Sequence, residues 1–387
     1  MKARSVVAPG VGAAALAAVI GAALPAGAHP VPIGRYAEIP YGIRPDHPHP
    51  TDRGGPRRTG RLEGTAPAQQ PRRLWERSLR HRRPRGPTVA ADGTLYVGTM
   101  GGLTALSPDG TERWSVRLGA VQAAPSLAPS EDVVALTRGG LVAMVTPEGV
   151  VRRSADLGAP ARGSPLVLDD GSVLVSTIDR RVHRLDANLR RVFSVELGDG
   201  TASTVSRTRR GALAVAAGSL LTLLDRSGTL RRQVTLGGRA TAPAAVADDG
   251  TLWVPTVEGI LHAVDPGGHV RSRTELGSRH FDGAAPAIGH DGAVRVPTMS
   301  EGVICVGPGG TERWRLPNEA GYHAPAAIDA QDTTLVVDRG GRLLAIAADG
   351  TERWRVVLGT YSYQAPVLAA DGTLYVTTDR GALQAWR

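Results

Sequence analysis

Aromatic and cationic side chains gather in a few short segments of this 387-residue sequence, where they could bind a ligand. Three of the segments end in Ala-Pro and read SRHFDGAAP (278–286), EAGYHAP (319–325) and TYSYQAP (360–366). They hold three of the seven tyrosines and one of the two phenylalanines. A fourth segment, RHRRPRG (80–86), is rich in arginine. Aromatic side chains and arginine dominate binding hot spots, so these segments are the candidate recognition residues.

Groups that could carry out catalysis or hold a metal are few. The sequence has no phosphate-binding G-x-x-x-x-G-K-[ST], no zinc-binding H-E-x-x-H and no nucleophile elbow G-x-S-x-G. Cys305 lies in the apolar run GVICVG, which predicts a buried, inert thiol. The pairs Asp169-Asp170 and Asp248-Asp249 stand beside glycine, as turn residues do. The tract DHPHP (46–50) has two histidines and no metal-ligand spacing, so we expect neither an enzyme nor a metal site.

The elements that must position the recognition residues are set by an internal repeat. The octet SPDGTERW (107–114) returns as GPGGTERW (307–314) and AADGTERW (347–354), so the spacings are multiples of 40. A period of this length is typical of solenoids and propellers. Each unit contains four short runs rich in Val, Leu and Thr, bounded by Gly and Asp, which predicts four strands joined by hairpin turns.

Counting the units predicts an all-β, eight-bladed β-propeller of four-stranded blades over residues 72–387. Seven units are complete, and the eighth stops at Arg387 after three strands. The segment RRLWERSL (72–79) matches the fourth strand of the other units, and Trp75 precedes Trp114 by 39 residues. We therefore expect the N-terminal strand to close the last blade, which leaves no open sheet edge.

The tryptophan of the octet has two possible roles. It could form an aromatic platform for a ligand, or it could cover the junction between blades. Trp75, Trp114, Trp314 and Trp354 share one register, where other units have Arg153, Phe193, Arg232 or Ser272. We favour packing, since a large side chain at a repeated position suits a repeated junction.

The repeat resembles a known family. The segment ALSPDGTERW (105–114) resembles the tryptophan-docking repeat of pyrroloquinoline-quinone-type (PQQ-like) propellers, and DGTLYVTTDRGALQAW (371–386) resembles their blade interiors. The segment DRGGPRRTGR (52–61) resembles a strap that often precedes such propellers. The resemblance covers residues 52–387.

The resemblance implies a fold more specifically than an activity. The family includes quinoprotein dehydrogenases, in which adjacent cysteines form a disulfide, acidic groups bind calcium and long insertions separate blades. One cysteine and blades of about 40 residues depart from that pattern, so we expect no cofactor. In size this chain is closest to the propeller subunit of the outer-membrane β-barrel assembly machinery, a lipoprotein anchored through an N-terminal cysteine. No cysteine precedes Cys305, so we do not expect a lipoprotein.

The N-terminal segments predict export. Residues 1–28 combine a basic start, an apolar run and the small-residue site Ala26-Gly27-Ala28, as a signal peptide does. The apolar run is short for a membrane span, so we expect no stable membrane insertion after signal removal, although a retained anchor is the alternative. Residues 29–71 are rich in Pro, Gly and Arg and predict an extended linker that contains the strap, 52–61. The expected location is periplasmic or extracellular.

The formal charge of +9 is concentrated rather than spread over the repeats. Residues 72–85 carry seven arginines against Glu76, whereas from Gly86 onward acids and bases nearly cancel. A nucleic-acid-binding protein would show a basic face along the fold, so we expect no nucleic-acid partner.

These observations predict an exported, non-enzymatic propeller, expected to be a monomer, that binds or scaffolds in the cell envelope. The alternative is a quinone-dependent oxidoreductase or its degenerate relative. Connectors into the inner strands of a propeller share one face, so the aromatic and arginine segments should meet there, where loops on a rigid scaffold commonly bind partners. We predict a groove for a protein segment or an anionic envelope ligand, although the same residues could be loop packing and solvated charge. The predicted residues are Arg83, His280, Phe281, Asp282, Tyr322, His323, Tyr361 and Tyr363.

Overall fold

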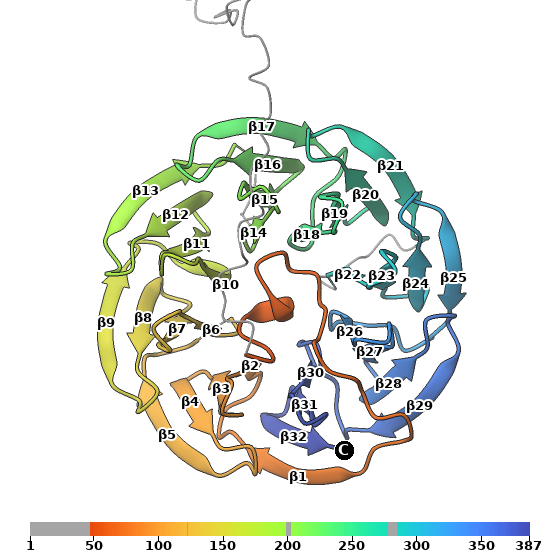
Figure 1. The fold of residues 1–387 in the computed structure, drawn as a ribbon, viewed down its shortest axis with the longest axis horizontal. Coiled ribbons are helices and arrows are strands. Elements are labelled where there is room, and N and C mark those ends of the chain that lie inside the picture. Colours follow the sequence, from red (N-terminus) through yellow and green to blue (C-terminus); the bar gives the residue numbers. More distant parts are fainter. Residues whose placement is uncertain (1–46, 122, 199–202, 278–284) are drawn as a thin grey trace, which may run out of the picture. The chain divides into compact units, whose positions relative to one another are not determined.

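The computed structural model describes residues 47–387 except 122, 199–202 and 278–284. Within this part of the chain, 32 strands form eight four-stranded antiparallel sheets arranged as the blades of a ring (Figure 1). The prediction of an eight-bladed β-propeller is confirmed. One short 3-10 element, η1 (Asp52–Gly54), lies at the centre of the ring.

In blades 1 to 7 the strands run from the innermost to the outermost in chain order, whereas blade 8 takes its outermost strand, β1, from the start of the propeller. Blades 1 and 2 comprise β2 (Arg85–Val89), β3 (Leu95–Gly98), β4 (Gly102–Leu106), β5 (Glu112–Arg117), β6 (Ser126–Leu127), β7 (Val133–Leu136), β8 (Leu141–Val145) and β9 (Val151–Asp156). Blades 3 and 4 comprise β10 (Ala161–Val167), β11 (Val173–Thr177), β12 (Arg181–Leu185), β13 (Arg191–Glu196), β14 (Ser206–Arg207), β15 (Leu213–Ala217), β16 (Leu220–Leu224) and β17 (Leu230–Thr235).

The second half of the ring repeats the same order. Blades 5 and 6 comprise β18 (Ala245–Val246), β19 (Leu252–Pro255), β20 (Ile260–Val264), β21 (Val270–Glu275), β22 (Ala287–Ile288), β23 (Val294–Pro297), β24 (Val303–Val306) and β25 (Glu312–Leu316). Blades 7 and 8 comprise β26 (Ala327–Ile328), β27 (Thr334–Val337), β28 (Arg342–Ile346), β29 (Glu352–Val357), β30 (Val367–Leu368), β31 (Leu374–Thr377), β32 (Ala382–Trp386) and, as the outermost strand, β1 (Arg73–Ser78).

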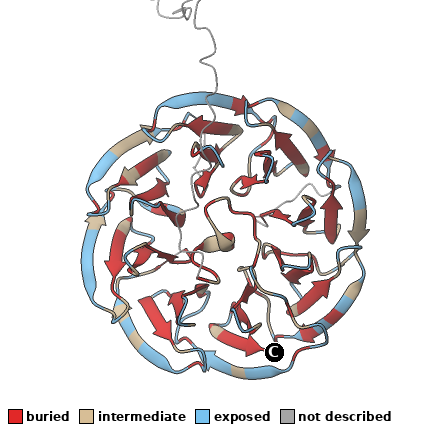
Figure 2. Cartoon of the chain, viewed as in Figure 1, coloured by how far each residue is buried: buried red, intermediate tan, exposed pale blue. Residues whose placement is uncertain are grey.

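The hydrophobic core lies between neighbouring blades. The second and third strands are packed on both faces, so almost all their residues are buried, whereas the outermost strands are largely exposed (Figure 2). One cluster joins Trp253 and Leu261 of blade 5 to Ile288, Val294 and other residues of blade 6. Strands packed on both faces read as continuous apolar runs, which explains the uninterrupted Val, Leu and Ala of the blade interiors.

Strand β1 closes the ring as the sequence predicted. It pairs antiparallel with β32, with Trp75 opposite Ala385 and Arg77 opposite Leu383. The backbones of Arg72 and Arg387 exchange hydrogen bonds just outside these strands. Blade 8 is therefore built from both ends of the described chain.

The octet tryptophans pack across the junctions, as we predicted. Each indole Nε1 donates to a backbone carbonyl of the next segment round the ring: Trp75 to Pro108, Trp114 to Pro147, Trp314 to Ala348 and Trp354 to Pro67. A Cβ on Gly149, whose φ is +87°, would approach the Trp114 ring to 2.7 Å. The glycine of the repeated turn is therefore required by the tryptophan of the preceding blade.

Residues 47–62, here called the strap, cross the central channel. Their backbone bonds to innermost strands around the ring: Leu127 N donates to the Pro50 carbonyl, Val246 N to Arg57 and Ile288 N to Thr59. His49 and Val89 exchange two backbone hydrogen bonds. The segment expected at 52–61 thus extends to 47, and this part of the predicted linker is folded into the propeller.

Candidate functional site

Four of the predicted recognition residues meet on one face of the ring, over blades 7, 8 and 1. The His323 ring lies 5.4 Å from the Tyr363 ring and 6.0 Å from the Tyr361 ring. Tyr361 and Tyr363 pack edge to face at 5.4 Å. The Arg83 guanidinium lies over Tyr363 at 5.1 Å from the ring centroid, within the range of a cation–π interaction. These residues, called the aromatic cluster below, come from three different connectors.

A buried carboxylate holds the arginine in place. Asp379, which is 3% exposed, accepts from Arg83 Nε at 3.0 Å and from Arg82 Nη2 at 3.2 Å. The Asp379 backbone accepts from Arg83 N and donates to the Tyr361 carbonyl. The hydrogen bond to Asp379 raises the pKa of Arg83 above its ordinary value. Asp379 escaped the sequence analysis because TDRG (378–381) reads as an ordinary hairpin turn.

The Tyr363 hydroxyl is a hydrogen-bonding group rather than an acid or base at neutral pH. A hydrogen bond with Tyr361, together with burial, raises the pKa of Tyr363 above its ordinary value. Tyr361, Tyr363 and His323 are half-buried, and Arg83 is exposed. The cluster therefore offers ring faces, phenol groups and a guanidinium, which is the chemistry of recognition.

Tyr322 is a correction to the predicted site. It is fully buried and packs with Val303, Val336 and Leu344 between blades 6 and 7. Its hydroxyl accepts from Asn318 Nδ2 at 2.9 Å, and burial raises its pKa to about 12. Because it has no exposed surface, Tyr322 belongs to the core and not to a groove.

The remaining predicted residues, His280, Phe281 and Asp282, lie outside the described residues. The structure therefore places the cluster over blades 7, 8 and 1, and the contribution of the connector into blade 6 stays a prediction.

The aromatic cluster borders a cavity at the mouth of the central channel. The cavity has a volume of about 190 Å³, and Tyr363, Gln364 and Arg85 line one side of it. Small residues of the other connectors line the rest, and Asp52 and Arg53 of the strap also contact it. Burial lowers the pKa of Arg53 to about 10, which leaves it charged at neutral pH. The Ala-Pro ends of the connectors thus surround a small polar opening.

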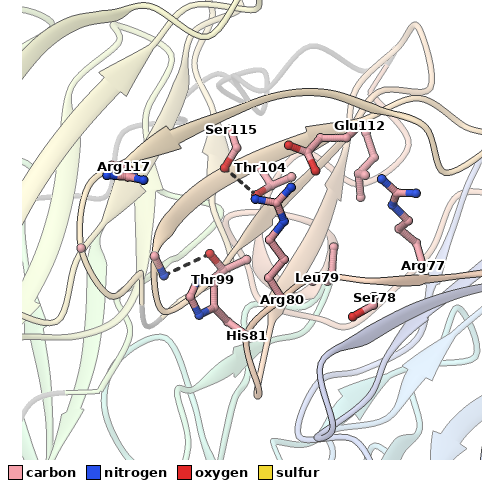
Figure 3. Close-up of a pocket in the computed structure, with 13 residues that line it drawn as sticks. Arg77, Ser78, Leu79, Arg80, His81, Thr99, Thr104, Glu112, Ser115 and Arg117 are labelled. Carbon is pink, nitrogen blue, oxygen red and sulfur yellow. Dashed lines mark hydrogen bonds between the residues drawn. The ribbon is translucent and has the colours of Figure 1, made fainter.

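A second and larger hollow, called the rim groove, lies between β1 and blade 1, near the outermost strands β1 and β5. Figure 3 shows the residues that line it. Its volume is about 490 Å³, and Arg77, Arg80, His81 and Arg117 line it together with Glu112. Sequence reasoning recorded the arginine run but did not predict a groove. Ser115 differs from the arginine that follows the other two TERW octets, but Ser154 and Ser194 occupy the same register in blades 2 and 3, so the sequence carries no specific signal for the groove.

Chemistry at other positions is limited within the described residues. Cys305 is a free, buried thiol whose pKa burial raises to about 11, so it is not a nucleophile at neutral pH. No group of three or more His, Cys, Asp or Glu in the described part of the chain could hold a metal ion. His47, from the DHPHP tract, accepts from Ala91 N and lies 3.4 Å from Glu131.

Comparison with known proteins gives the family. The family model described as "Outer membrane protein assembly factor BamB" matches residues 100–230 and 299–386, more than half of the chain. The chain belongs to this family.

No curated protein sequence matches this chain. No helix among the described residues is long and apolar enough to cross a bilayer.

Solved structures of two kinds share the fold. BamB from Moraxella catarrhalis aligns with a TM-score of 0.64 and 15% identity over 82% of this chain and 97% of that one. Quinohemoprotein alcohol dehydrogenase from Comamonas testosteroni aligns with a TM-score of 0.73 and 12% identity over 90% and 81%. A europium-containing methanol dehydrogenase aligns with a TM-score of 0.72 and 14% identity over 86% and 89%. At such identities the likeness shows the fold alone.

The channel mouth does not fit the quinone of the dehydrogenases. Its volume of about 190 Å³ is below the roughly 300–1,000 Å³ of typical small-molecule sites. The strap forms part of its lining, and the Arg53 guanidinium is hydrogen-bonded to the Pro286 and Arg58 carbonyls, which fixes that lining. The single cysteine cannot supply the paired cysteines expected beside a quinone. We therefore derive no reaction through this cofactor.

Proposed function

We propose that this protein is an exported, non-enzymatic propeller that binds a segment of a partner protein in the cell envelope. The observation that carries the proposal is the aromatic cluster: three rings and Arg83 from three connectors meet on one face, and Asp379 holds Arg83 in place. Rigidly presented aromatic and arginine side chains bind partners at low entropic cost.

The absence of an enzymatic role is part of the proposal. It is supported by the small channel mouth, by the strap across the channel and by the high pKa of the Cys305 thiol. Saturable binding of pyrroloquinoline quinone with calcium, accompanied by reduction of a dye, would overturn this part. That assay needs only the purified protein.

Export and envelope location are also proposed. They are supported by the signal-like residues 1–28 and by the name of the matched family, which describes an outer membrane assembly factor. N-terminal sequencing of the protein recovered from the envelope fraction tests cleavage after Ala28. Recovery of the uncleaved chain in the cytoplasm would contradict export.

Site-specific photo-crosslinking tests the binding function. A photoreactive residue replaces Arg82, whose side chain is 75% exposed beside the aromatic cluster. We expect an adduct with one envelope protein, and we expect it to disappear when Tyr363→Ala is added. The control places the same photoreactive residue at Val192, an exposed position on β13 of blade 3. Equal adducts at both positions, or adducts that survive Tyr363→Ala, would show that the cluster is not the binding site.

A further inference from the structure

We propose that the rim groove binds the carboxylates of an acidic segment of the partner protein. This inference rests on the proposed function and specifies its ligand chemistry. The groove lies where the outermost strand of blade 8 meets blade 1, at the start of the connector 79–85 (Figure 3). Its occupant would lie along this face of the disc and continue toward the aromatic cluster.

The charge of the groove selects an acidic occupant. Arg77, Arg80 and Arg117 line it, and none of their side chains has a hydrogen bond or ion pair to the described residues. Glu112 is the one acidic residue among the described lining residues. The planar guanidinium group of arginine can donate two parallel hydrogen bonds to one carboxylate. Three guanidinium groups around one groove can therefore bind two or more acidic side chains.

At the groove, blade 1 differs from blades 6 and 7 at one position, although blades 2 and 3 also have a serine there (Ser154 and Ser194). In blades 6 and 7 an arginine follows the TERW sequence, and it pairs with the glutamate three residues earlier: Arg315 with Glu312 and Arg355 with Glu352. In blade 1 that position is Ser115, whose hydroxyl lies 3.3 Å from Thr104 Oγ1. The short side chain leaves space above β4 and leaves Glu112 without its strand partner.

The connector joins the groove to the aromatic cluster. Arg80 and His81 line the groove, Arg82 and Arg83 bind Asp379, and Arg85 reaches the channel mouth. The His81 ring packs closely against the backbone of Gly101, since a Cβ on Gly101 would come within 2.6 Å of His81 Nε2. Arginines therefore recur along the connector from the rim groove to the channel mouth, and a partner segment that follows the connector would be acidic and extended.

A charged peptide tests the proposal directly. The probe is a fluorescein-labelled octapeptide rich in glutamate, and its control has glutamine at each of those positions. We expect the glutamate peptide to bind the full-length protein and the double variant Arg80→Gln/Arg117→Gln to weaken it about tenfold or more. Binding should also weaken as salt rises, because part of the groove is open to solvent. Equal binding of the two peptides, or no binding of the glutamate peptide, overturns the proposal.

A control variant at another exposed arginine distinguishes binding in the rim groove from non-specific electrostatic binding. Arg153 is exposed on β9 of blade 2 and has no ion pair among the described residues. We expect Arg153→Gln to leave peptide affinity within about twofold, whereas an equal loss in that variant overturns the proposal. If the photo-crosslinked partner is still captured by Arg80→Gln/Arg117→Gln but not by Tyr363→Ala, the rim groove is refuted while the proposed function stands.

Discussion

Tyr322 and Tyr363 show how two tyrosines from similar connectors come to lie in different surroundings. Both stand a few residues before an Ala-Pro end, and both were predicted to face a ligand. Tyr322 lies in an extended bridge opposite Asp338, and side chains alternate along such a segment, so Tyr322 points into the core and its neighbour His323 stays half-exposed. The sequence shows the residue types of a connector but not the residue at which extended pairing begins.

Substitution of these two tyrosines should separate stability from binding. We expect Tyr322→Ala to lower the free energy of unfolding by about 3–5 kcal/mol, as loss of a large core aromatic does. We expect Tyr363→Ala to lower it by less than about 1 kcal/mol and to weaken partner binding by about 2 kcal/mol. Urea unfolding and binding to the captured partner measure the two effects. A large loss of stability in Tyr363→Ala would place that side chain in the core instead.

His49 predicts a dependence of stability on pH. Burial lowers its pKa from 6.5 to about 4. Below pH 6.5 the unfolded chain therefore takes up a proton that native His49 does not, so its contribution is complete above pH 6.5 and is lost as the pH falls toward 4. The shift corresponds to at most about 3 kcal/mol. Urea unfolding at pH 7 and pH 4.5 should show this loss, and His49→Asn should reduce it.

The asparagine variant also shows whether His49 is the group responsible. An unchanged dependence in His49→Asn would show that other groups are responsible. His183 and His262, whose pKa values are also lowered by burial, are the next candidates.

Strand β1 is the element on which closure of the ring depends. Its pairing with β32 covers an edge that would otherwise expose unpaired backbone, and Trp75 docks onto blade 1. The octet and its 40-residue period were enough to predict this strand, because closure requires only a count of units and one matching segment. The strap was harder to predict in full, since residues 47–51 have no repeat or hydrophobic period to mark them.

Loss of the Trp75 contact should therefore destabilise the whole ring. We expect Trp75→Ala to lower the free energy of unfolding by about 3 kcal/mol or more. Trp75→Phe should cost less, because it keeps most of the packing and loses the hydrogen bond to the Pro108 carbonyl, worth about 1 kcal/mol. Deletion of 72–79 should lead to aggregation, measured by light scattering. A monodisperse and equally stable deletion variant would contradict closure by β1.

Across the whole molecule, the strap gives a repeat protein a second set of contacts besides those between neighbouring blades. Blade contacts are local in the ring, as in other repeat proteins, but the strap bonds to innermost strands of blades far apart. The same crossing limits the channel to a small mouth, and the binding surface proposed above lies on the connector face instead. The proposed binding and the stability of the ring should therefore depend on different residues.

Arg58 is the strap residue whose loss should show this most clearly. It is fully buried, and its guanidinium donates to the Val205 carbonyl near blade 4, the Pro165 carbonyl of blade 3 and the Asp52 carbonyl of the strap itself. We expect Arg58→Met to lower the free energy of unfolding by roughly 3 kcal/mol, because buried carbonyls lose their donors.

Arg58→Lys should rescue little of this stability, since an ammonium group cannot span the same acceptors. Arg57→Met is the matched control: Asp248 is half-exposed and keeps Arg61 as its second partner, so the cost should be smaller than that of Arg58→Met. Urea unfolding of the three variants measures the difference, and full rescue by lysine would mean that positive charge alone, rather than the fork joining blades 3 and 4, holds the strap in the channel.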